Sequence, residues 1–280
     1  MATREERVSV GKGFSLSGPA TPLPELVRGI WSSRRLLALL SRKEFFVRYR
    51  RASFGVVWAL VLPLLQAVVL AVVVSRFVTF ETDGNFTLFV FAGTLAWSFF
   101  SQTISGGTTA IVDNADMSAK IYFPRALFPL VVVGSGLYGL VISAFILEVF
   151  VLGFGEFVPP RAALLVPAIA VLVALSTAAS LVLSALQVYF RDMKYVIAAA
   201  LLPWFYLTPI FYPLDRVGRL RTLVEINPVT GAVELLRAAT VGADRGWTVA
   251  LGWTVLWTVA LLVLAALIHR RHDRVMSDLL

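Results

Sequence analysis

Long apolar stretches alternate along the chain with short segments that carry the charges. Six stretches of at least 20 residues contain no Asp, Glu, Lys or Arg: residues 52–75, 84–112, 126–147, 162–190, 195–214 and 246–269. A helix needs about 20 residues to cross ~30 Å of hydrocarbon, and it satisfies its backbone hydrogen bonds without water. The pattern predicts an all-α integral membrane protein with six transmembrane helices.

The composition agrees with this pattern. Hydrophobic residues make up 58% of the 280 residues and charged residues 15%, and the mean hydropathy is +0.82. A soluble domain has about 45–50% apolar and about 25% charged residues. The first 50 residues lack the short apolar core of a signal peptide, so we expect none.

The basic residues orient the predicted spans. Of the 25 Lys and Arg residues, 18 fall in the terminal segments and in the two loops on the same side of the spans. Because basic residues mark cytoplasmic flanks, we expect a multi-pass protein of the cell inner (cytoplasmic) membrane with both termini in the cytoplasm. The net charge of +8 then reflects membrane topology, and we expect no nucleic-acid partner.

Three segments outside the spans have a pattern of their own. Residues 23–51 alternate apolar and basic positions and predict an amphipathic helix at the membrane interface, after a cytoplasmic tail of residues 1–22. Residues 113–125 form a short cytoplasmic loop. The external connection 215–245 is long enough to need structure of its own, and we expect two short helices there, around 219–224 and 230–240.

The sequence shows no cysteine, metal or nucleotide site of the usual kinds. It has no cysteine, and its two histidines, His269 and His272, lie in a basic tail where a metal cation would be repelled. Residues 134–139 spell G-x-G-x-x-G, but inside an apolar helix this pattern indicates close helix packing and not dinucleotide binding. No phosphate-binding P-loop occurs, so any nucleotide hydrolysis must come from a partner.

Glu148 is the one carboxylate that we place within a predicted span. An ionisable group at membrane depth is a functional hypothesis by default, because it costs ~2.5–3.5 kcal/mol at the bilayer centre. Its place near the external end of the third span favours a structural or interfacial role, with a role facing the substrate as the alternative.

The fifth span contains Pro203, Pro209 and Pro213, so its helix should be kinked or broken. Two explanations fit the aromatic residues around these prolines. They either offer flat faces to sugar rings in a channel or form an ordinary aromatic belt at the external interface. The residues concerned are Trp204, Phe205, Tyr206, Phe211 and Tyr212.

Several short motifs, in this order on a six-span map, resemble one family. They are residues 48–58 (RYRRASFGVVW), 120–125 (KIYFPR), 189–195 (YFRDMKY), 207–213 (LTPIFYP), and Asn227-Pro228 ahead of 234–237 (ELLR). The chain resembles the Wzm-like type-2 ABC transporter permeases of polysaccharide export, which serve O-antigen, teichoic acid and galactan. It looks most similar to the permease of the actinobacterial lipid-linked galactan exporter.

The resemblance implies a role for each segment. Residues 52–270 correspond to the permease domain, 23–51 to a gate helix, 112–125 to a loop that couples to the ATPase, 214–245 to an external gate region, and 271–280 to a cytoplasmic tail. The residues implied in ATPase coupling are Asp113, Asn114, Asp116, Met117 and Lys120.

Arginines at the cytoplasmic surface suit the headgroup of a lipid-linked substrate. Guanidinium binds phosphate in bidentate fashion, which fits a pyrophosphate at the substrate entrance. Attraction to anionic lipid, at about 1 kcal/mol per basic residue, would produce the same cluster. The residues are Arg48, Arg50, Arg51 and Arg125.

The function implied is export of a lipid-linked polysaccharide, such as an undecaprenyl- or decaprenyl-diphosphate-linked galactan or an O-antigen-like glycan. The family pattern implies a homodimer with two ABC ATPase subunits, which bind ATP and Mg²⁺, while this chain holds no cofactor and has no catalytic site. The alternatives are an ABC exporter of a drug or small lipid, then a membrane channel, or a glycan-modifying membrane enzyme. The channel and the enzyme are disfavoured by the single intramembrane carboxylate and by histidines confined to the tail.

Overall fold

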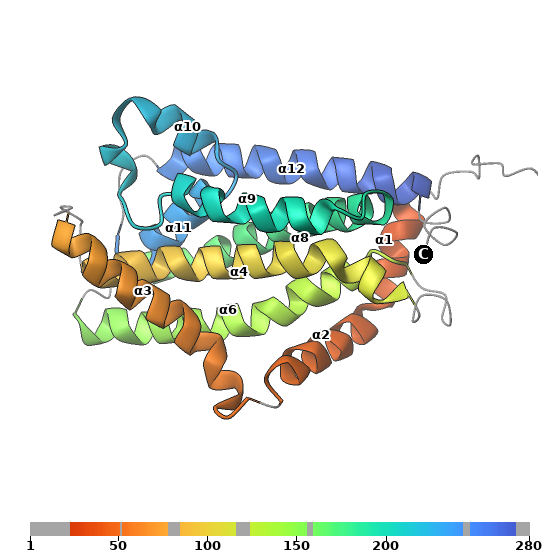
Figure 1. Ribbon diagram of the computed structural model, residues 1–280, viewed down its shortest axis with the longest axis horizontal. Coiled ribbons are helices and arrows are strands. Elements are labelled where there is room, and N and C mark those ends of the chain that lie inside the picture. The colour runs from red at the N-terminus through yellow and green to blue at the C-terminus, as the bar shows by residue number, and fades with distance from the viewer. Residues whose placement is uncertain are drawn as a thin grey trace, which may run out of the picture.

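A computed structural model describes residues 23–50, 52–77, 85–115, 124–155, 159–242 and 247–272. Six long helices run side by side along the molecule (Figure 1). They are α3 (Trp58–Phe77), α4 (Phe86–Asp113), α6 (Leu127–Gly153), α8 (Leu165–Tyr189), α9 (Met193–Leu207) and α12 (Trp247–His272). Helix α1 (Leu23–Ser32) and the last turn of α12 lie at one end of this bundle, which we call the α1 end (Figure 1). The other is the α10 end, after α10 (Arg221–Ile226).

Five of the predicted spans are helices long and apolar enough to cross a membrane: α3, α4, α6, α8 and α12. The prediction of an all-α, multi-pass membrane protein is therefore confirmed. The fifth predicted span differs from its expected length, because α9 has 15 residues and ends at Leu207. Thr208 is extended, with φ −89° and ψ 134°, as expected of a residue that precedes proline. The predicted break is thus located at Thr208-Pro209.

Helix α4 lies at the centre of the bundle and packs against α3, α6, α8 and α9. Small residues allow α6 and α8 to approach α4 closely. A Cβ atom built on Gly107 would lie 2.6 Å from Ser180 Oγ of α8, and that hydroxyl donates to the Thr103 carbonyl at 3.0 Å. On the opposite side, a Cβ on Gly136 of α6 would lie 3.2 Å from the Phe99 ring. The glycine pattern at 134–139 therefore serves helix packing, as the sequence predicts.

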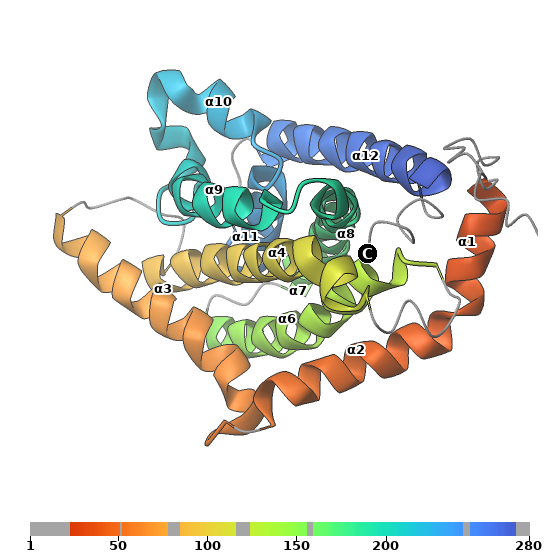
Figure 2. The same cartoon turned by 45° about the vertical axis from the view of Figure 1, so that its right-hand side comes forward.

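The predicted single helix over 23–51 is wrong in one respect: the structure divides it. Helices α1 and α2 (Arg34–Tyr49) meet at a turn on Ser33, whose hydroxyl donates to the Gly29 carbonyl at 2.9 Å. Figure 2 shows α1 turning away from the line of α2. One face of α2 is fixed to α6, because Ser41 and Phe45 are buried there, while its basic residues stay exposed.

The two short helices predicted between the fifth and sixth spans are present, as α10 and α11 (Thr230–Thr240). Every residue of α11 is buried, so this helix does not lie on the surface of the bundle. Helix α11 packs against α4, α8 and α12 within the bundle. At its start, the Gly231 amide donates to Thr254 Oγ1 at 3.1 Å. The place of a Gly231 Cβ is already taken by the Ala250 backbone of α12.

We expect Gly231→Ala to lower the stability of the bundle by about 1–3 kcal/mol, the usual cost of overpacking. The added methyl group must displace the backbone of α12, which cannot yield as a side chain could. Thermal unfolding of the purified protein in detergent measures the effect. Gly252→Ala on α12 is the matched control, because nothing lies within 4 Å of its Cβ position. Equal melting temperatures for the two variants would contradict the packing described.

Candidate functional site

Helix α4 presents a polar face to its surroundings, although most of the helix is buried. Between residues 98 and 113 the exposed or half-buried positions follow one another at helical spacing, and all of them are polar except Gly106 and Val112. The polar ones are Ser98, Ser101, Gln102, Ser105, Thr109 and Asp113. On α12, by contrast, the exposed side chains between residues 255 and 267 are all apolar. Polar groups turned toward hydrocarbon are costly unless they are paired, and no hydrogen bond from the Gln102 amide is formed within the described residues. This face therefore suits water or protein and not lipid.

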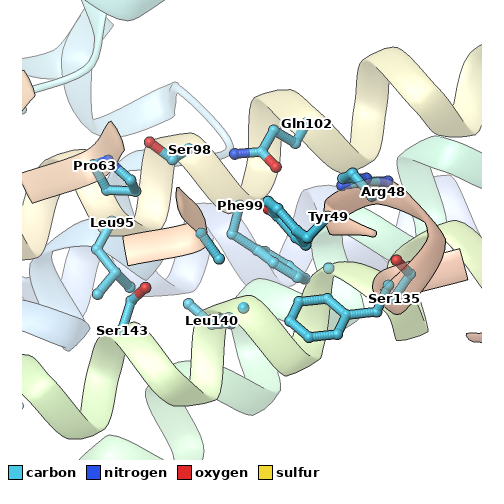
Figure 3. Close-up of a pocket in the computed structure, with 14 residues that line it drawn as sticks. Arg48, Tyr49, Pro63, Leu95, Ser98, Phe99, Gln102, Ser135, Leu140 and Ser143 are labelled. Carbon is cyan, nitrogen blue, oxygen red and sulfur yellow. The ribbon is translucent and has the colours of Figure 1, made fainter. Parts of the chain in front are cut away.

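The polar face borders a narrow hollow of about 30 Å³ between α2, α3, α4 and α6, which we call the inner hollow. Figure 3 shows Ser98 and Gln102 on the α4 side and Ser135 on the α6 side, with Tyr49 of α2 reaching into it. The Ser135 hydroxyl is buried and has no hydrogen-bond partner in the described part of the chain. The inner hollow thus brings hydroxyl and amide groups together in a space that suits water.

A second, wider hollow of about 350 Å³ lies nearer the α1 end, between α2, α4 and α6, and we call it the end hollow. Lys43, Glu44 and Arg48 of α2 line it together with Asp113 and Asn114 of α4. Arg48 also lines the inner hollow, so its side chain borders both. Its ion pair with Glu44 is long, at 4.0 Å, and largely exposed. Such pairs contribute little, which leaves the Arg48 guanidinium available to another anion.

The end hollow brings together two groups of residues that the sequence assigns to different roles. Asp113 and Asn114 belong to the segment implied in ATPase coupling, and Arg48 to the substrate entrance. The Asn114 amide donates to the Ala110 carbonyl at 2.8 Å and closes the last turn of α4, while Asp113 is exposed. Three other coupling candidates, Asp116, Met117 and Lys120, lie outside the described residues.

The remaining entrance arginines are not gathered at one place. Arg50 is exposed at the end of α2 and lines a separate surface hollow with Lys43 and Phe46. Arg125, at the start of α6, is only 9% exposed and lines neither the inner nor the end hollow. Arg51 lies outside the described residues. Arg48 is therefore the described arginine best placed for an anionic ligand in the two hollows.

Most of the predicted channel aromatics pack against one another or against α4. The Trp204 indole donates to Asn227 Oδ1 at 2.9 Å, and its ring lies 5.3 Å from that of Phe100. Phe205 is buried, and the Tyr212 hydroxyl donates to the Tyr206 carbonyl at 3.1 Å. Phe211 packs 6.1 Å from Phe205. Tyr206, at 57% exposure, presents the most open ring of the five.

Glu148 lies five residues before the end of α6, toward the α10 end. Both oxygens of its carboxylate are buried and make no hydrogen bond within the described residues. The carboxylate therefore does not reach the surface of the bundle. Sequence reasoning also missed Gln102 and Ser135, which become notable only because the structure turns them toward a shared hollow.

Comparison with known proteins places this arrangement in a family. Residues 35–241 match the family described as ABC-2 type transporter. The chain belongs to this family. It is 31% identical over 216 residues to an O-antigen export system permease protein RfbA of Myxococcus xanthus, covering 76% of this chain and 83% of that protein.

Two proteins of the same description from Klebsiella pneumoniae are 28% and 26% identical, each over 71% of this chain and 77% of theirs. The prediction of a Wzm-like type-2 ABC permease is confirmed by these findings. Permeases of this family generally work with an ATPase partner.

The polar face of α4 can be tested by cysteine labelling, because the chain has no cysteine of its own. The variants are placed in lipid nanodiscs, which leave both sides of the membrane open to the reagent. We expect Gln102→Cys to react with a charged maleimide at least about tenfold faster than buried Thr103→Cys, because the thiolate forms only in contact with water. Val263→Cys, which is 54% exposed on the apolar face of α12, should stay as slow as the buried site. Equal reaction at Gln102 and Val263 would contradict the distinction between the two faces.

Proposed function

We propose that the chain is the permease subunit of an ATP-driven ABC transporter that exports a lipid-linked polysaccharide across the cytoplasmic membrane. Its relatives are described as O-antigen export permeases, which supports a glycan substrate. The observation that carries the proposal is the polar face of α4, whose Gln102 and Ser105 are exposed within a membrane-spanning helix. Its hydroxyl and amide groups suit the hydroxyl groups of a sugar chain.

A second copy of this chain completes the pathway in this proposal. Gln102 and Ser105 of the polar face are exposed on a single bundle, where lipid would meet them. Two copies that turn these faces toward each other remove them from lipid and enclose a polar path between them. A homodimer is therefore the assembly that best accounts for the placement of the polar residues.

Arg48 receives the substrate headgroup in this scheme. A diphosphate offers paired oxygens to a guanidinium, and the resulting charge-assisted hydrogen bonds are stronger than neutral ones. From the junction of the two hollows, Arg48 holds the diphosphate of an undecaprenyl or decaprenyl carrier, while the carrier chain stays in the bilayer. The glycan, a galactan or an O-antigen-like polymer, then follows the polar face of α4. Arg50 and Arg51 attract the headgroup on its approach.

The energy comes from a separate ATPase subunit, which binds ATP and Mg²⁺. Two ATPase subunits join two permeases and contact the segment 112–125 at the cytoplasmic side, which we assign to the α1 end. Asp113 and Asn114 line the same hollow as Arg48. A displacement of the α4 terminus by the ATPase therefore changes the shape of the headgroup site. The chain itself performs no covalent chemistry and holds no cofactor.

The role of Arg48 predicts a specific loss of export. In cells that depend on the tagged chain, we expect Arg48→Glu to reduce export at least about tenfold, the equivalent of one lost charge-assisted contact, and to cause lipid-linked glycan to accumulate. Arg48→Lys keeps the charge and should retain part of the activity. Arg35→Glu is the control, because Arg35 is exposed on α2 and lines neither hollow. Equal losses for Arg35→Glu and Arg48→Glu would favour general attraction to anionic lipid instead.

The ATPase partner can be identified directly. We expect affinity purification of the tagged chain from its own membrane, in mild detergent, to recover an ABC ATPase at about 1:1, as a two-plus-two complex requires. Asp113→Arg should insert normally but lose most ATP-driven export, because it reverses a charge at the contact. Asp116→Arg and Met117→Arg should behave alike. Repeated recovery of the intact chain alone would overturn the proposal in favour of a channel or a membrane enzyme.

A further inference from the structure

A buried arginine joins three parts of the chain near the α10 end. Arg237 of α11 is 0% exposed. Its Nη1 atom lies 2.6 Å from Glu234 Oε1, its Nη2 donates to the Ile210 carbonyl at 2.6 Å, and its Nε donates to the Phe89 carbonyl at 3.3 Å. The guanidinium also lies 3.6 Å from the centre of the Phe89 ring. These partners come from α11, from the segment after α9, and from the first turns of α4.

The contact with Ile210 satisfies a backbone carbonyl in the segment that follows the proline break. Ile210 lies in the non-helical segment after α9, so its buried backbone has no helical partner, and an unpaired buried carbonyl is costly. Arg237 supplies the donor for this carbonyl. Gly93 of α4 makes room for this meeting, because a Cβ there would lie 2.8 Å from both Arg237 Nη2 and the Ile210 carbonyl oxygen. The three parts of the chain therefore meet at Gly93, where even one added methyl group would displace Arg237 or Ile210.

Asn227 reinforces the same junction from the start of α11. Its Nδ2 atom donates to Thr208 Oγ1 at 3.0 Å, and its Oδ1 atom accepts from the Trp204 indole and from the Val229 amide at 3.1 Å. The end of α9 is thus held to α11 by Asn227, while Arg237 holds both to α4. The aromatic side chains of residues 204–212 keep their places because of these contacts.

Helix α4 carries this junction at one end and the coupling segment at the other. It is continuous over 28 residues, which corresponds to about 42 Å at 1.5 Å per residue. Phe89 and Gly93 lie in its first turns, and Asp113 is its last residue. A displacement imposed at Asp113 is therefore transmitted along a rigid helix to the contacts of Arg237.

We propose that Arg237 is a positioning residue that locks segment 208–213 and α11 to the start of α4, so that the α10 end of the permease follows the movement of α4. This inference rests on the proposed function, because it gives the ATPase a route to the far end of the pathway. The lock is built from hydrogen bonds to backbone carbonyls, which are set by geometry and not by the identity of the glycan.

The test must remove the lock without leaving a buried charge. Arg237→Met alone would strand Glu234, so the informative variant is the double substitution Glu234→Gln with Arg237→Met, which is neutral and similar in volume. We expect this variant to insert, to bind the ATPase and to hydrolyse ATP near the wild-type rate, while export falls about tenfold and amide hydrogen exchange in residues 208–213 rises about tenfold. Arg237→Lys retains a cation that can donate to the carbonyls and should recover part of both losses.

Gly93→Ala gives an independent approach to the same junction if the double variant fails to fold. Its methyl group displaces Arg237 Nη2 and the Ile210 carbonyl without any change of charge. We expect the same separation of ATP hydrolysis from export, whereas Gly252→Ala, with open space at its Cβ position, should behave as wild type. Export and exchange at wild-type levels in either junction variant would overturn the inference. A uniform loss of ATPase binding, hydrolysis and export would also overturn it, because a purely structural role predicts that outcome.

The same measurements distinguish a failure of the proposed function from a failure of the inference about Arg237. If the wild-type chain exports no lipid-linked glycan, the proposed function fails, whatever the variants do. Hydrogen exchange at residues 208–213 still reports the lock in that case, because it needs no transport. If wild-type export is normal and exchange is unchanged in the double variant, the inference about Arg237 alone fails.

Discussion

Inside hydrocarbon, each polar group of a protein must find its partner in the protein itself or in enclosed water. This constraint accounts for most of what the structure shows. The long spans are helices because only helices satisfy their own backbone there. Where the prolines interrupt α9, side chains of Asn227 and Arg237 meet the polar groups left over. Where α4 turns polar residues outward, the remaining partners must come from water, substrate or another copy of the chain.

The constraint also explains why α11 can carry charge while wholly buried. Glu234 and Arg237 neutralise each other, and the other guanidinium donors go to backbone carbonyls. A buried ion pair of this kind is weak support for stability, since desolvation offsets the attraction. The pair instead fixes the relative positions of its neighbours, because the planar guanidinium donates hydrogen bonds in fixed directions. Arg237 thus specifies where α4, α9 and α11 meet.

The placement of Arg48 has a functional consequence. One side chain borders both the hollow beside the polar face of α4 and the hollow beside Asp113 and Asn114. In the function that we propose, substrate binding and contact with the ATPase would act on the same small region, where α2 is fixed to α6 through Ser41 and Phe45. Under that proposal, a small displacement of α4 relative to α2 would couple the two.

The sequence by itself determined the membrane class, five of the six spans and the presence of two short helices, predicted around 219–224 and 230–240, because apolar run length, proline and charge distribution act locally. It also indicated the break in the fifth span. Only the tertiary structure decided that α11 is buried, that Arg48 and Asp113 line one hollow while Arg125 does not, and that most of the aromatic residues of 204–212 pack together. The first two of these facts depend on which helix faces meet between segments far apart in the sequence, as when Arg237 reaches Phe89. The side-chain pattern within one helix does not indicate which other helix its buried face will contact.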